Sequence, residues 1–526
     1  MIVTADKRAS LAAEKSLIMG GNALDAAISA QNVLSVVEPQ SSGLGGGGFL
    51  LYYDNLKKKI YAFDGRETAS SLVKPDMFLN TDKTKKKFLK AVTSKYSVGV
   101  PGLYNMLADA HNLHGNLDWE LLFKSAIKHS EKFLVSPRLS KLLTWAPHIK
   151  RNSYVKSVYF INDNPAEAGT IISNLELKKS LTILSKDKYS LKEGELAKNI
   201  AKTMTGYIPI KDMNQWKTNK IEPICKKYGK YKICGFPPPT SGGISVLQIL
   251  GILKNRLDLP KKYEPFFSRH AFLEASRLSY LDRDFYIADP SYFDVPIKAL
   301  LDENYLKKRA NLINKNSSPD YEKGIIDEYR ESNLISGQTL ENNSTTHISI
   351  VDSMGNAVSL TSSIEFAFGS GITIGGFFMN NQLTDFSFLS RNNEGLKIAN
   401  SISPGKKPRS SMAPTLIFDE EKKLIGIVGS PGGSRIICYV AKVIFDILYL
   451  NKEPSAAIDS IHLCSRSKFS EIEDSKNNQD LINYLKIKGH SVKVKKMTSG
   501  VNMIWRRKDY WQGIADPRRE GYAIGN

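Results

Sequence analysis

The stretch TTHISIVDSMGNAVSLTSS, residues 345–363, predicts a β-hairpin from its own pattern. Polar and apolar residues alternate on both sides of a turn segment, 352–356, which is rich in residues that favour tight turns. With the turn centred on Met354, Thr345 is placed opposite Ser363. Directly opposed side chains in an antiparallel pair have Cβ atoms about 4.5–5.5 Å apart, so the two hydroxyls are expected to hydrogen bond.

The residues before this hairpin give the Thr–Ser pair a second interpretation. Taken alone, a cross-strand pair of hydroxyls is usually structural. Here, however, a polar segment at residues 314–344 runs into the strand, and we expect it to be a long surface connection that is open to cleavage. Cleavage before Thr345 would free an α-amino group, with a pKa of about 7.7–8.0, beside the Thr345 hydroxyl. Such an amine can act as base for the hydroxyl, which is the arrangement of an N-terminal nucleophile.

The remainder of the chain predicts a mixed α/β fold. Two helices are expected near the N-terminus, at residues 9–19 and 22–38. Residues 100–330 look mostly helical, and residues 345–440 are rich in β-branched and aromatic residues, which is typical of strands. The final stretch alternates between helical and strand patterns.

A glycine loop at residues 43–48 contains a match to the GxGxxG pattern, at Gly43, Gly45 and Gly48. A dinucleotide fingerprint follows a strand and opens a helix. This loop does the reverse, since it follows a predicted helix and opens a predicted strand at 49–53. We therefore exclude a Rossmann site and expect a tight turn at which backbones pack closely, although its N–H groups could still line a ligand cleft.

The composition excludes several classes of protein. The chain has 526 residues and a formal net charge of +20, and its lysine runs are expected to be solvated surface, because no stacking aromatics lie among them as in a nucleic-acid site. No uncharged apolar run approaches the roughly 18 residues that mark a membrane-spanning helix. The first residues lack the apolar core of a signal peptide. As written, the chain is expected in the cytoplasm, or in the periplasm or outside the cell if the true start lies upstream.

Four cysteines do not make a disulfide framework in a chain of this length. Cys225 and Cys234 could be bridged, whereas Cys438 and Cys464 are expected to stand alone in apolar surroundings. Neither a Cys-x-x-Cys pair nor a His-Glu-x-x-His motif is present. We therefore expect neither a metal nor an organic cofactor.

A series of motifs extends this interpretation to nearly the whole chain. They are GGNALDAA at 20–27, GLGGGG at 43–48, RETA at 66–69, PPPTSGG at 237–243, TTH at 345–347, NNQ at 380–382, SSMAP at 410–414, GSPGGSR at 429–435 and ADPRREG at 515–521. In this order they closely resemble the γ-glutamyltransferase (γ-glutamyl transpeptidase) family of N-terminal nucleophile hydrolases. The resemblance implies a four-layer αββα sandwich. It also implies that Thr345 attacks the carbonyl of Ser344 and divides an inactive precursor into a large subunit, 1–344, and a small subunit, 345–526.

The implied substrates are γ-glutamyl compounds such as glutathione and its conjugates, whose acyl group passes to water or to an amino acid or peptide. The residues that match the family's site are Arg66, Ser410 and Ser411 for the α-carboxylate, Gln382 and Asp385 for the α-ammonium, and Gly432 and Gly433 for the oxyanion hole. On sequence alone, Arg66 would more often pair with Glu67 at the surface. The serines, the glycines and the 382–385 segment would equally suit ordinary turns.

Two positions and one segment depart from the family's pattern. Ser363 replaces a threonine that supports the nucleophile, and it keeps the hydroxyl. Glu365 stands where many members carry an asparagine near the α-ammonium; its carboxylate could bind the amine or could indicate a different acyl group. Residues 386–403, where some relatives carry a lid with a tyrosine, contain no tyrosine. Since an open site admits water, we expect hydrolysis at least comparable with transfer.

Two alternatives stay open at this point. One is another amidase on the same scaffold, such as a glutaryl or cephalosporin acylase or a poly-γ-glutamate depolymerase, and Glu365 and the lid segment would discriminate it. The other is a non-catalytic basic binding protein that never cleaves itself. The intact set of Thr345, Arg66, Asp385 and the Gly432–Gly433 pair argues against that second alternative.

Overall fold

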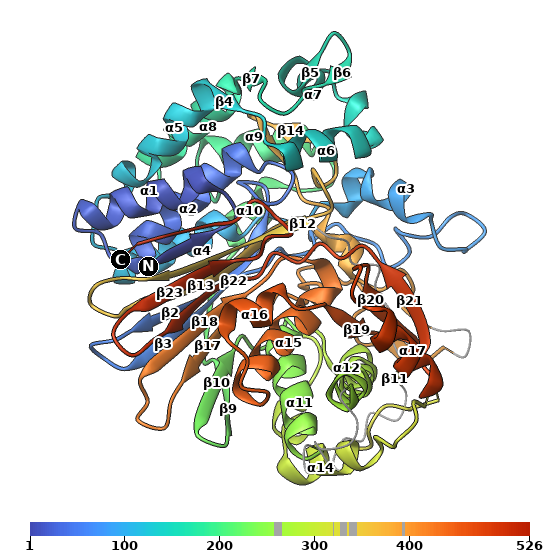
Figure 1. Ribbon diagram of the computed structural model, residues 1–526. Helices are drawn as coiled ribbons and strands as arrows, with labels where there is room; N and C mark the ends of the chain where they lie inside the picture. The colour runs from blue at the N-terminus through green and yellow to red at the C-terminus, as the bar shows by residue number, and fades with distance from the viewer. Residues whose placement is uncertain (257–265, 319, 327–333, 336–343, 392–394, 526) are drawn as a thin grey trace.

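Two stacked antiparallel sheets form the centre of the computed structural model, which describes residues 1–256, 266–318, 320–326, 334–335, 344–391 and 395–525 (Figure 1). The first sheet has the spatial order β24 (Tyr522–Ile524), β1 (Ile2–Thr4), β12 (Ser344–Val351), β13 (Ala357–Glu365), β2 (Gly47–Asp54), β3 (Lys59–Gly65) and β8 (Asn219–Ile221). The second has the order β23 (Trp511–Ala515), β22 (Asn502–Arg506), β18 (Leu424–Gly429), β17 (Thr415–Phe418), β10 (Tyr231–Gly235) and β9 (Ile224–Tyr228).

Helices cover the outer face of each sheet (Figure 1). On the first sheet lie α1 (Lys7–Ile18), α2 (Ala23–Val37) and α4 (Leu103–His114), with α5 (Lys124–Glu131) and α8 (Leu175–Lys186) packed beside them. On the second lie α11 (Gly242–Lys254) and α15 (Ile436–Leu448), with α12 (Phe267–Tyr286) packed against α11. The order of layers is therefore helix, sheet, sheet, helix, which confirms the αββα sandwich expected from the family resemblance.

Strand β2 shows why the layers stack in this way. Its side chains alternate between two faces, as the period of a strand requires. Leu50 and Tyr52 belong to the core that the first sheet shares with its helices. Phe49, Leu51 and Tyr53 belong to the core between the sheets, where Phe49 packs on Phe236 with ring centroids 4.7 Å apart. Both faces are buried, so the strand reads as a continuous apolar run rather than as an alternating one.

Smaller elements complete the fold. The remaining helices are α3 (Phe88–Val92), α6 (Pro137–Trp145), α7 (Ser153–Tyr159), α9 (Glu195–Thr203), α10 (Ile210–Gln215), α13 (Ile297–Leu300), α14 (Glu303–Asn311), α16 (Pro454–Asp459) and α17 (Gln479–Ile487). The small sheets pair β4 (Phe133–Leu134) with β7 (Ile171–Ile172), β5 (Phe160–Ile161) with β6 (Asn164–Pro165), β11 (Leu334–Ile335) with β16 (Lys397–Ile398), β14 (Thr373–Ile374) with β15 (Phe377–Phe378), and β19 (Leu463–Ser465) with β20 (Phe469–Glu473) and β21 (Ser491–Lys495).

The two N-terminal helices begin and end close to the predicted residues. Gly20 adopts φ +89°, a conformation that ends α1 and that glycine takes without strain. Asn22 accepts hydrogen bonds from the N–H groups of Leu24 and Asp25, while the Asp25 carboxylate accepts one from the Asn22 N–H, which is a complete capping box. Strand β1, before α1, was not predicted from the sequence.

The glycine loop serves close packing, as predicted. A Cβ on Gly45 would lie 2.3 Å from the Phe378 carbonyl oxygen, and one on Gly46 would lie 2.3 Å from that of Ser363. Both distances are far below van der Waals contact, so only glycine fits at either position. The loop leads from α2 into β2, and this order confirms that it is not a dinucleotide fingerprint.

The predicted hairpin is formed by β12 and β13 in the expected register. Thr346 pairs with Ser362, and the pairing continues in step to Val351 and Ala357. The one irregularity lies at the open end, between Ser344 and Thr346, so Thr345 sits at a local bulge. Bulges often occur beside active sites, where they redirect a side chain.

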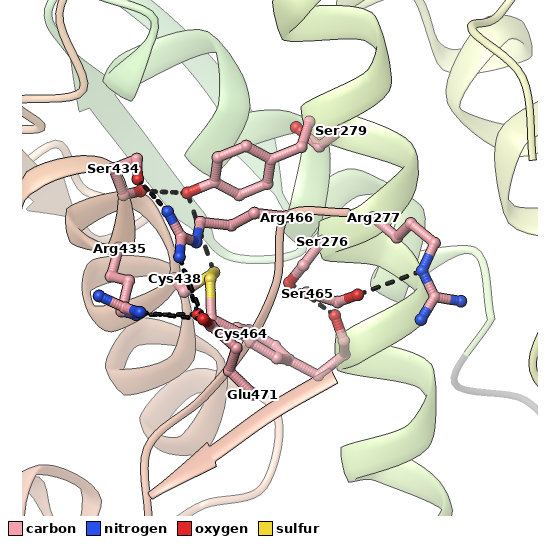
Figure 2. The surroundings of a disulfide bond; sticks show 12 residues. Ser276, Arg277, Ser279, Ser434, Arg435, Cys438, Cys464, Ser465, Arg466 and Glu471 are labelled. Atoms are coloured by element: carbon pink, nitrogen blue, oxygen red, sulfur yellow. Dashed lines mark hydrogen bonds and ion pairs between the residues drawn. A yellow bond between two sulfur atoms is a disulfide. The ribbon is translucent and has the colours of Figure 1, made fainter. Parts of the chain in front are cut away.

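The cysteine prediction was half wrong. Cys225 and Cys234 are bridged, as was allowed, but Cys438 and Cys464 are bridged as well. Figure 2 shows this second disulfide, which joins α15 to β19 in the buried interior. The sequence could not reveal it because the two cysteines lie 26 residues apart on different elements, and only packing of the helix against the strand brings them together.

Three further expectations have a structural outcome. The segment at residues 100–330 is mostly helical, except for the short strands β4 to β7 and for β8, β9 and β10, which join the two central sheets. The polar connection at 314–344 lies largely outside the described residues. In the part of the chain that the structure describes, no helix combines the length and the apolar character that crossing a membrane requires.

Candidate active site

Thr345 lies next to both a second hydroxyl and the carbonyl that precedes it. The Thr345 Oγ1 and Ser363 Oγ atoms are 3.1 Å apart, and Ser363 Oγ donates a hydrogen bond of 2.8 Å to the carbonyl oxygen of Ser344. The N–H of Glu365 donates to Ser363 Oγ at 2.9 Å. Because the single hydroxyl proton of Ser363 is donated to the Ser344 carbonyl, Ser363 Oγ can only accept a hydrogen bond from the Thr345 hydroxyl. The pair predicted from the hairpin register is therefore formed.

This arrangement suits attack of Thr345 on its own chain. A proton can move from the Thr345 hydroxyl toward Ser363, while the Ser363 proton polarises the Ser344 carbonyl that would be attacked. Ser344 is itself fixed, because its side chain donates to the carbonyl of Gln40 and is 1% exposed. The junction between Ser344 and Thr345 is thus buried within β12 and is not a loose surface loop.

A pocket of about 250 Å³ opens above Thr345. Residues from distant parts of the sequence line it together, among them nine of the eleven predicted site residues: Arg66, Thr345, Ser363, Glu365, Gln382, Asp385, Ser410, Ser411 and Gly433. Ser344 and Gly432 are adjacent to lining residues but are not in its wall. The sequence prediction therefore converges on one cavity.

Arg66 is held deep in this pocket rather than at the surface. Its side chain is fully buried, and its Nη2 donates to Asp385 Oδ2 at 2.6 Å and to the carbonyl oxygen of Arg409 at 3.1 Å. Its Nε donates to the carbonyl of Pro408 at 3.0 Å. Among the described residues, Nη1 has no hydrogen-bond acceptor. Arg66 also lies 3.7 Å from Glu67, but both side chains are fully buried, so the pair that sequence statistics favoured is not at the surface.

Asp385 and Gln382 lie beside Arg66 on the short helix η4 (Gln382–Asp385). Gln382 Nε2 donates to Asp385 Oδ2 at 2.6 Å, so this carboxylate oxygen receives both the amide and the Arg66 guanidinium. A buried ion pair of this kind offsets the cost of taking both charges out of water. It also presents a cation and an anion side by side, which matches the carboxylate and ammonium of an α-amino acid.

Ser410 and Ser411 are positioned by the PPPTSGG segment and by α12. Ser241 Oγ donates to the carbonyl of Ser410 at 2.7 Å, and Arg283 of α12 donates through Nη2 to Ser411 Oγ at 2.7 Å. Because Arg283 occupies an acceptor position of Ser411, the serine proton is available for an anion in the pocket. This is the role that the family resemblance implies for the two serines.

Glu365 sits in a conformation that its residue type rarely adopts. It has φ +74° and is 4% exposed, and its carboxylate accepts a hydrogen bond from the Asn381 side chain. A glutamate in the left-handed region costs energy, and such strain is often found at functional sites. Its carboxylate is the second one, after that of Asp385, among the residues that line the pocket.

Gly432 and Gly433 form a turn that only glycine accommodates. Their φ values are +141° and +58°, and a Cβ on Gly432 would lie 2.6 Å from Tyr439 Cε2. The turn opens helix η5 (Gly433–Arg435), which runs into α15. Backbone N–H groups at such a turn are suited to stabilise a developing oxyanion.

The segment 386–403 does not close over the pocket in the part that is described. Between Asp385 and Ser410, no described residue lines the pocket; residues 392–394 lie outside the described chain. Asn400 instead supports the site from behind, since its Nδ2 donates to the carbonyl of Asp385 at 2.7 Å.

Two charged residues beside the site were missed by the sequence analysis. Glu67 is fully buried 3.7 Å from Arg66 Nη1, and burial raises the pKa of its carboxyl to about 8. Arg519 donates through Nη1 to the carbonyl of Thr345 at 3.2 Å. Both lie inside motifs that had been noted, RETA and ADPRREG, so their position in those motifs was the available signal; their burial was not visible in the sequence.

The raised pKa of Glu67 predicts a pH-dependent stability. An ordinary glutamate loses its proton near pH 4.5, whereas folded Glu67 keeps it up to about pH 8, so the contribution of this group to stability is complete below pH 4.5 and is lost as the pH rises through 8. Glu67→Gln removes this loss. The melting temperature of the variant relative to the wild type is expected to rise by roughly 1 °C per pH unit across this range.

Thermal melts from pH 5 to pH 9 measure this effect, with Glu193→Gln as the control, because Glu193 is an exposed glutamate on another surface. A constant offset between Glu67→Gln and the wild type at every pH would show that Glu67 is ionised throughout.

Comparison with known proteins agrees with this geometry. Residues 9–526 match the family model described as gamma-glutamyltranspeptidase. The chain is 33% identical to the glutathione hydrolase proenzyme of Bacillus subtilis (strain 168), over 100% of this chain and 91% of that protein. It is 32% identical to the glutathione hydrolase proenzyme of Escherichia coli (strain K12), over 98% of this chain and 90% of that protein.

Solved structures show the same likeness. The cephalosporin acylase from Bacillus halodurans aligns with a TM-score of 0.84 at 24% identity, over 100% of this chain and 96% of that chain. At this level of identity, the alignment supports only a common fold. The gamma-glutamyltranspeptidase of Helicobacter pylori aligns with a TM-score of 0.59 at 28% identity, over 62% of this chain and 97% of that chain.

Proposed function

Because the chain belongs to the gamma-glutamyltranspeptidase family and is a γ-glutamyltransferase and glutathione hydrolase, we propose that Thr345 is its nucleophile and that the pocket around Thr345 is its γ-glutamyl site. The observation that carries this proposal is the joint placement of Thr345, Arg66 and Asp385 in one pocket. A nucleophile, a cation for a carboxylate and an anion for an ammonium are what a γ-glutamyl group requires.

The proposed maturation begins at the buried junction in β12. Thr345 Oγ1 bonds to the carbonyl carbon of Ser344, the peptide C–N bond breaks, and the nitrogen takes up the proton to become a free amine. Water then hydrolyses the resulting ester, which leaves a carboxylate on Ser344 and restores the Thr345 hydroxyl. Ser363 supports the step through its hydrogen bonds to both residues. The products are the chains 1–344 and 345–526.

In the mature site, the new α-amine acts as the base for the Thr345 hydroxyl. The α-carboxylate of the substrate binds Arg66, Ser410 and Ser411, and its α-ammonium binds Asp385 with Gln382. Attack on the γ-carbonyl then places negative charge on an oxygen that the N–H groups around Gly432–Gly433 stabilise.

The reaction proceeds in two halves. The leaving amine departs with a proton and leaves a γ-glutamyl ester on Thr345. Water or the amine of an amino acid or peptide then attacks this ester, which is ping-pong chemistry. Since no described residue of the 386–403 segment lines the pocket, water has access to the ester, and hydrolysis is proposed to be at least comparable with transfer.

The second candidate, a glutaryl or cephalosporin amide acylase, is distinguished by Glu365. A glutaryl group lacks the α-ammonium that a γ-glutamyl group carries. Glu365 and Asp385 both line the pocket, and two carboxylates there favour an acyl group with a positive charge. This observation supports the γ-glutamyl donor over the glutaryl one.

The assay that tests this choice compares matched donors. We expect glutamate to be released from γ-glutamyl-p-nitroanilide and from glutathione, with glutaryl-p-nitroanilide cleaved about 10- to 100-fold less efficiently, the scale of one lost charged contact. Glutamate and transfer products are measured with and without a dipeptide acceptor. Efficient cleavage of the glutaryl amide alone would assign the protein to the acylases, and release from poly-γ-glutamate alone to the depolymerases. An uncut, inactive chain would support the binding-protein alternative.

We also propose an oxidising compartment for this protein, either the periplasm or the exterior of the cell. Disulfides persist in such compartments and are rare in the cytosol. The two bridges, Cys225–Cys234 and Cys438–Cys464, therefore favour the second of the two locations expected from the sequence.

A further inference from the structure

A second hollow lies beside the active-site pocket. It has a volume of about 800 Å³ and is formed between α12, the β19–β21 sheet and the residue that follows Gly433. The residues that matter for its chemistry are Arg283, Ser434, Arg466, Glu471, Lys493 and Lys495. None of them has a role in the chemistry described above except Arg283, which supports Ser411.

Two connections join this hollow to the active site. Ser434 lines the hollow and directly follows Gly433, which lines the active-site pocket. Arg283 also lines the hollow, and its Nη2 donates to Ser411 Oγ of the active-site pocket at 2.7 Å. The two spaces therefore share a wall at the turn where the oxyanion would form.

The groups that line the active-site pocket account for one half of the donor. A cation with two serines and a pair of carboxylates suit the glutamyl half. The amine half, on the other side of the scissile bond, must lie beyond these groups, and the hollow adjoins the pocket at Gly433 and Ser434.

The two acidic residues of the hollow, Asp284 and Glu471, already form ion pairs with arginines. The Glu471 carboxylate accepts from Arg435 at 2.9 Å and from Arg466 at 3.0 Å, and Figure 2 shows Arg466 reaching from Glu471 to Ser434. Asp284 likewise contacts two arginines, Arg283 at 2.8 Å and Arg409 at 3.0 Å. Each acid is thus shared by two cations, so the hollow as a whole is positive.

The two lysines of β21 provide the positive charge that remains after these ion pairs are formed. Lys493 and Lys495 are both exposed, and on alternate positions of one strand they point to the same face. Lys493 Nζ lies 3.1 Å from the Phe469 ring centroid, and neither lysine has a carboxylate partner among the described residues. Two ammonium groups on one side of a hollow attract a carboxylate.

We propose that this hollow is the subsite for the amine half of the substrate, and that Lys493 and Lys495 attract the carboxylate of the leaving peptide and of amino acid or peptide acceptors. The inference rests on the proposed function, because it assigns the second half of the same reaction. Glutathione fits it, since its amine half ends in the carboxylate of a glycine. The two lysines act on specificity and do not take part in bond making.

The test uses three donors that differ only in the amine half. Glutathione carries the carboxylate, its glycine ethyl ester lacks that charge, and γ-glutamyl-p-nitroanilide has a neutral aromatic amine. In the double variant Lys493→Gln/Lys495→Gln, the KM for glutathione is expected to rise about 3- to 10-fold, as for two exposed ion pairs, while the ester and the anilide change less than about twofold. The difference should shrink in added salt, because exposed charges are screened.

The matched control is Lys57→Gln/Lys59→Gln. These lysines have the same spacing, are exposed, and Lys59 Nζ lies 5.1 Å from the Tyr61 ring centroid, much as Lys493 lies over Phe469. The control removes the same net charge far from the hollow and should leave all three donors unchanged. Equal effects of both double variants on glutathione would overturn the proposal, as would equal effects of the β21 variant on all donors. Failure of the wild type to cleave any of the donors would instead reject the proposed function.

Discussion

The Thr345→Ala protein is expected to stay a single chain of 526 residues and to lose activity toward γ-glutamyl-p-nitroanilide by about 10⁴- to 10⁶-fold, the scale seen when a nucleophile or its base is removed. The variant lacks the Oγ1 atom that lies 3.1 Å from Ser363 Oγ, so nothing can attack the Ser344 carbonyl. Without the cut, no α-amine forms at residue 345. Intact mass and N-terminal sequencing measure the outcome.

Two control variants test whether a folding defect, rather than the missing hydroxyl, prevents cleavage. Thr345→Ser keeps a hydroxyl and should still be cut. Thr346→Val alters the next residue, whose hydroxyl is buried and has no hydrogen-bond partner among the described residues, and should be cut like the wild type. A Thr345→Ala chain that is found cut between residues 344 and 345 would refute self-processing. Loss of cleavage in both controls, each of which keeps a hydroxyl at residue 345, would point to misfolding.

The Arg66→Lys variant is expected to raise the KM for γ-glutamyl-p-nitroanilide by about 10- to 100-fold, with a smaller change in kcat. Lysine keeps the charge but loses the planar fork, so it cannot contact Asp385, the backbone carbonyls and a substrate carboxylate at the same time. One lost hydrogen bond to a charged group is worth about 1.5–3 kcal/mol, which gives that range. Inhibition by free glutamate should weaken in parallel.

Cleavage into two chains provides the folding check for this variant, because Arg66 makes no described contact with Ser344, Thr345 or Ser363. Arg391→Lys, which changes an exposed arginine on the 386–403 segment, is the matched control. An unchanged KM in a correctly cut Arg66→Lys protein would remove Arg66 from the carboxylate site.

The hairpin shows what local sequence could predict. Alternation and turn residues fixed the register of β12 and β13, and with it the approach of Thr345 to Ser363. These signals act over a few residues, so they survive without knowledge of the rest of the chain. The bulge at Thr345 was not visible in them, because it depends on how Ser344 packs.

Contacts between residues far apart in the sequence could not be predicted from local sequence patterns. Arg66 and Asp385 are 319 positions apart, and local statistics favoured Glu67 as the partner of Arg66. Only the motif order of the family resemblance placed Arg66 and Asp385 in one site. The same limit explains why the Cys438–Cys464 bridge was missed, since no motif included that pair.

Burial was the other property that the sequence did not convey. Glu67 follows Arg66 in a motif that looks fully polar, yet both side chains are completely enclosed. The altered pKa of Glu67 is a consequence of that enclosure. Likewise, the positive φ of Glu365 is imposed by its surroundings and could not be anticipated from its residue type, which disfavours it.

The strand order of the first sheet has a consequence for a chain that has been cut. β12 and β13 belong to the downstream piece, yet they are flanked by β1 and β2 of the upstream piece. Strands of the two pieces are therefore interleaved in this sheet, and neither piece contains all of its strands. Dilution should not separate them, because parting requires both ladders to open at once, which amounts to global unfolding. After denaturation, the cut protein must reassemble from two separate chains, so its recovery should decrease as the protein concentration is lowered. The uncut precursor refolds from a single chain and does not need this association.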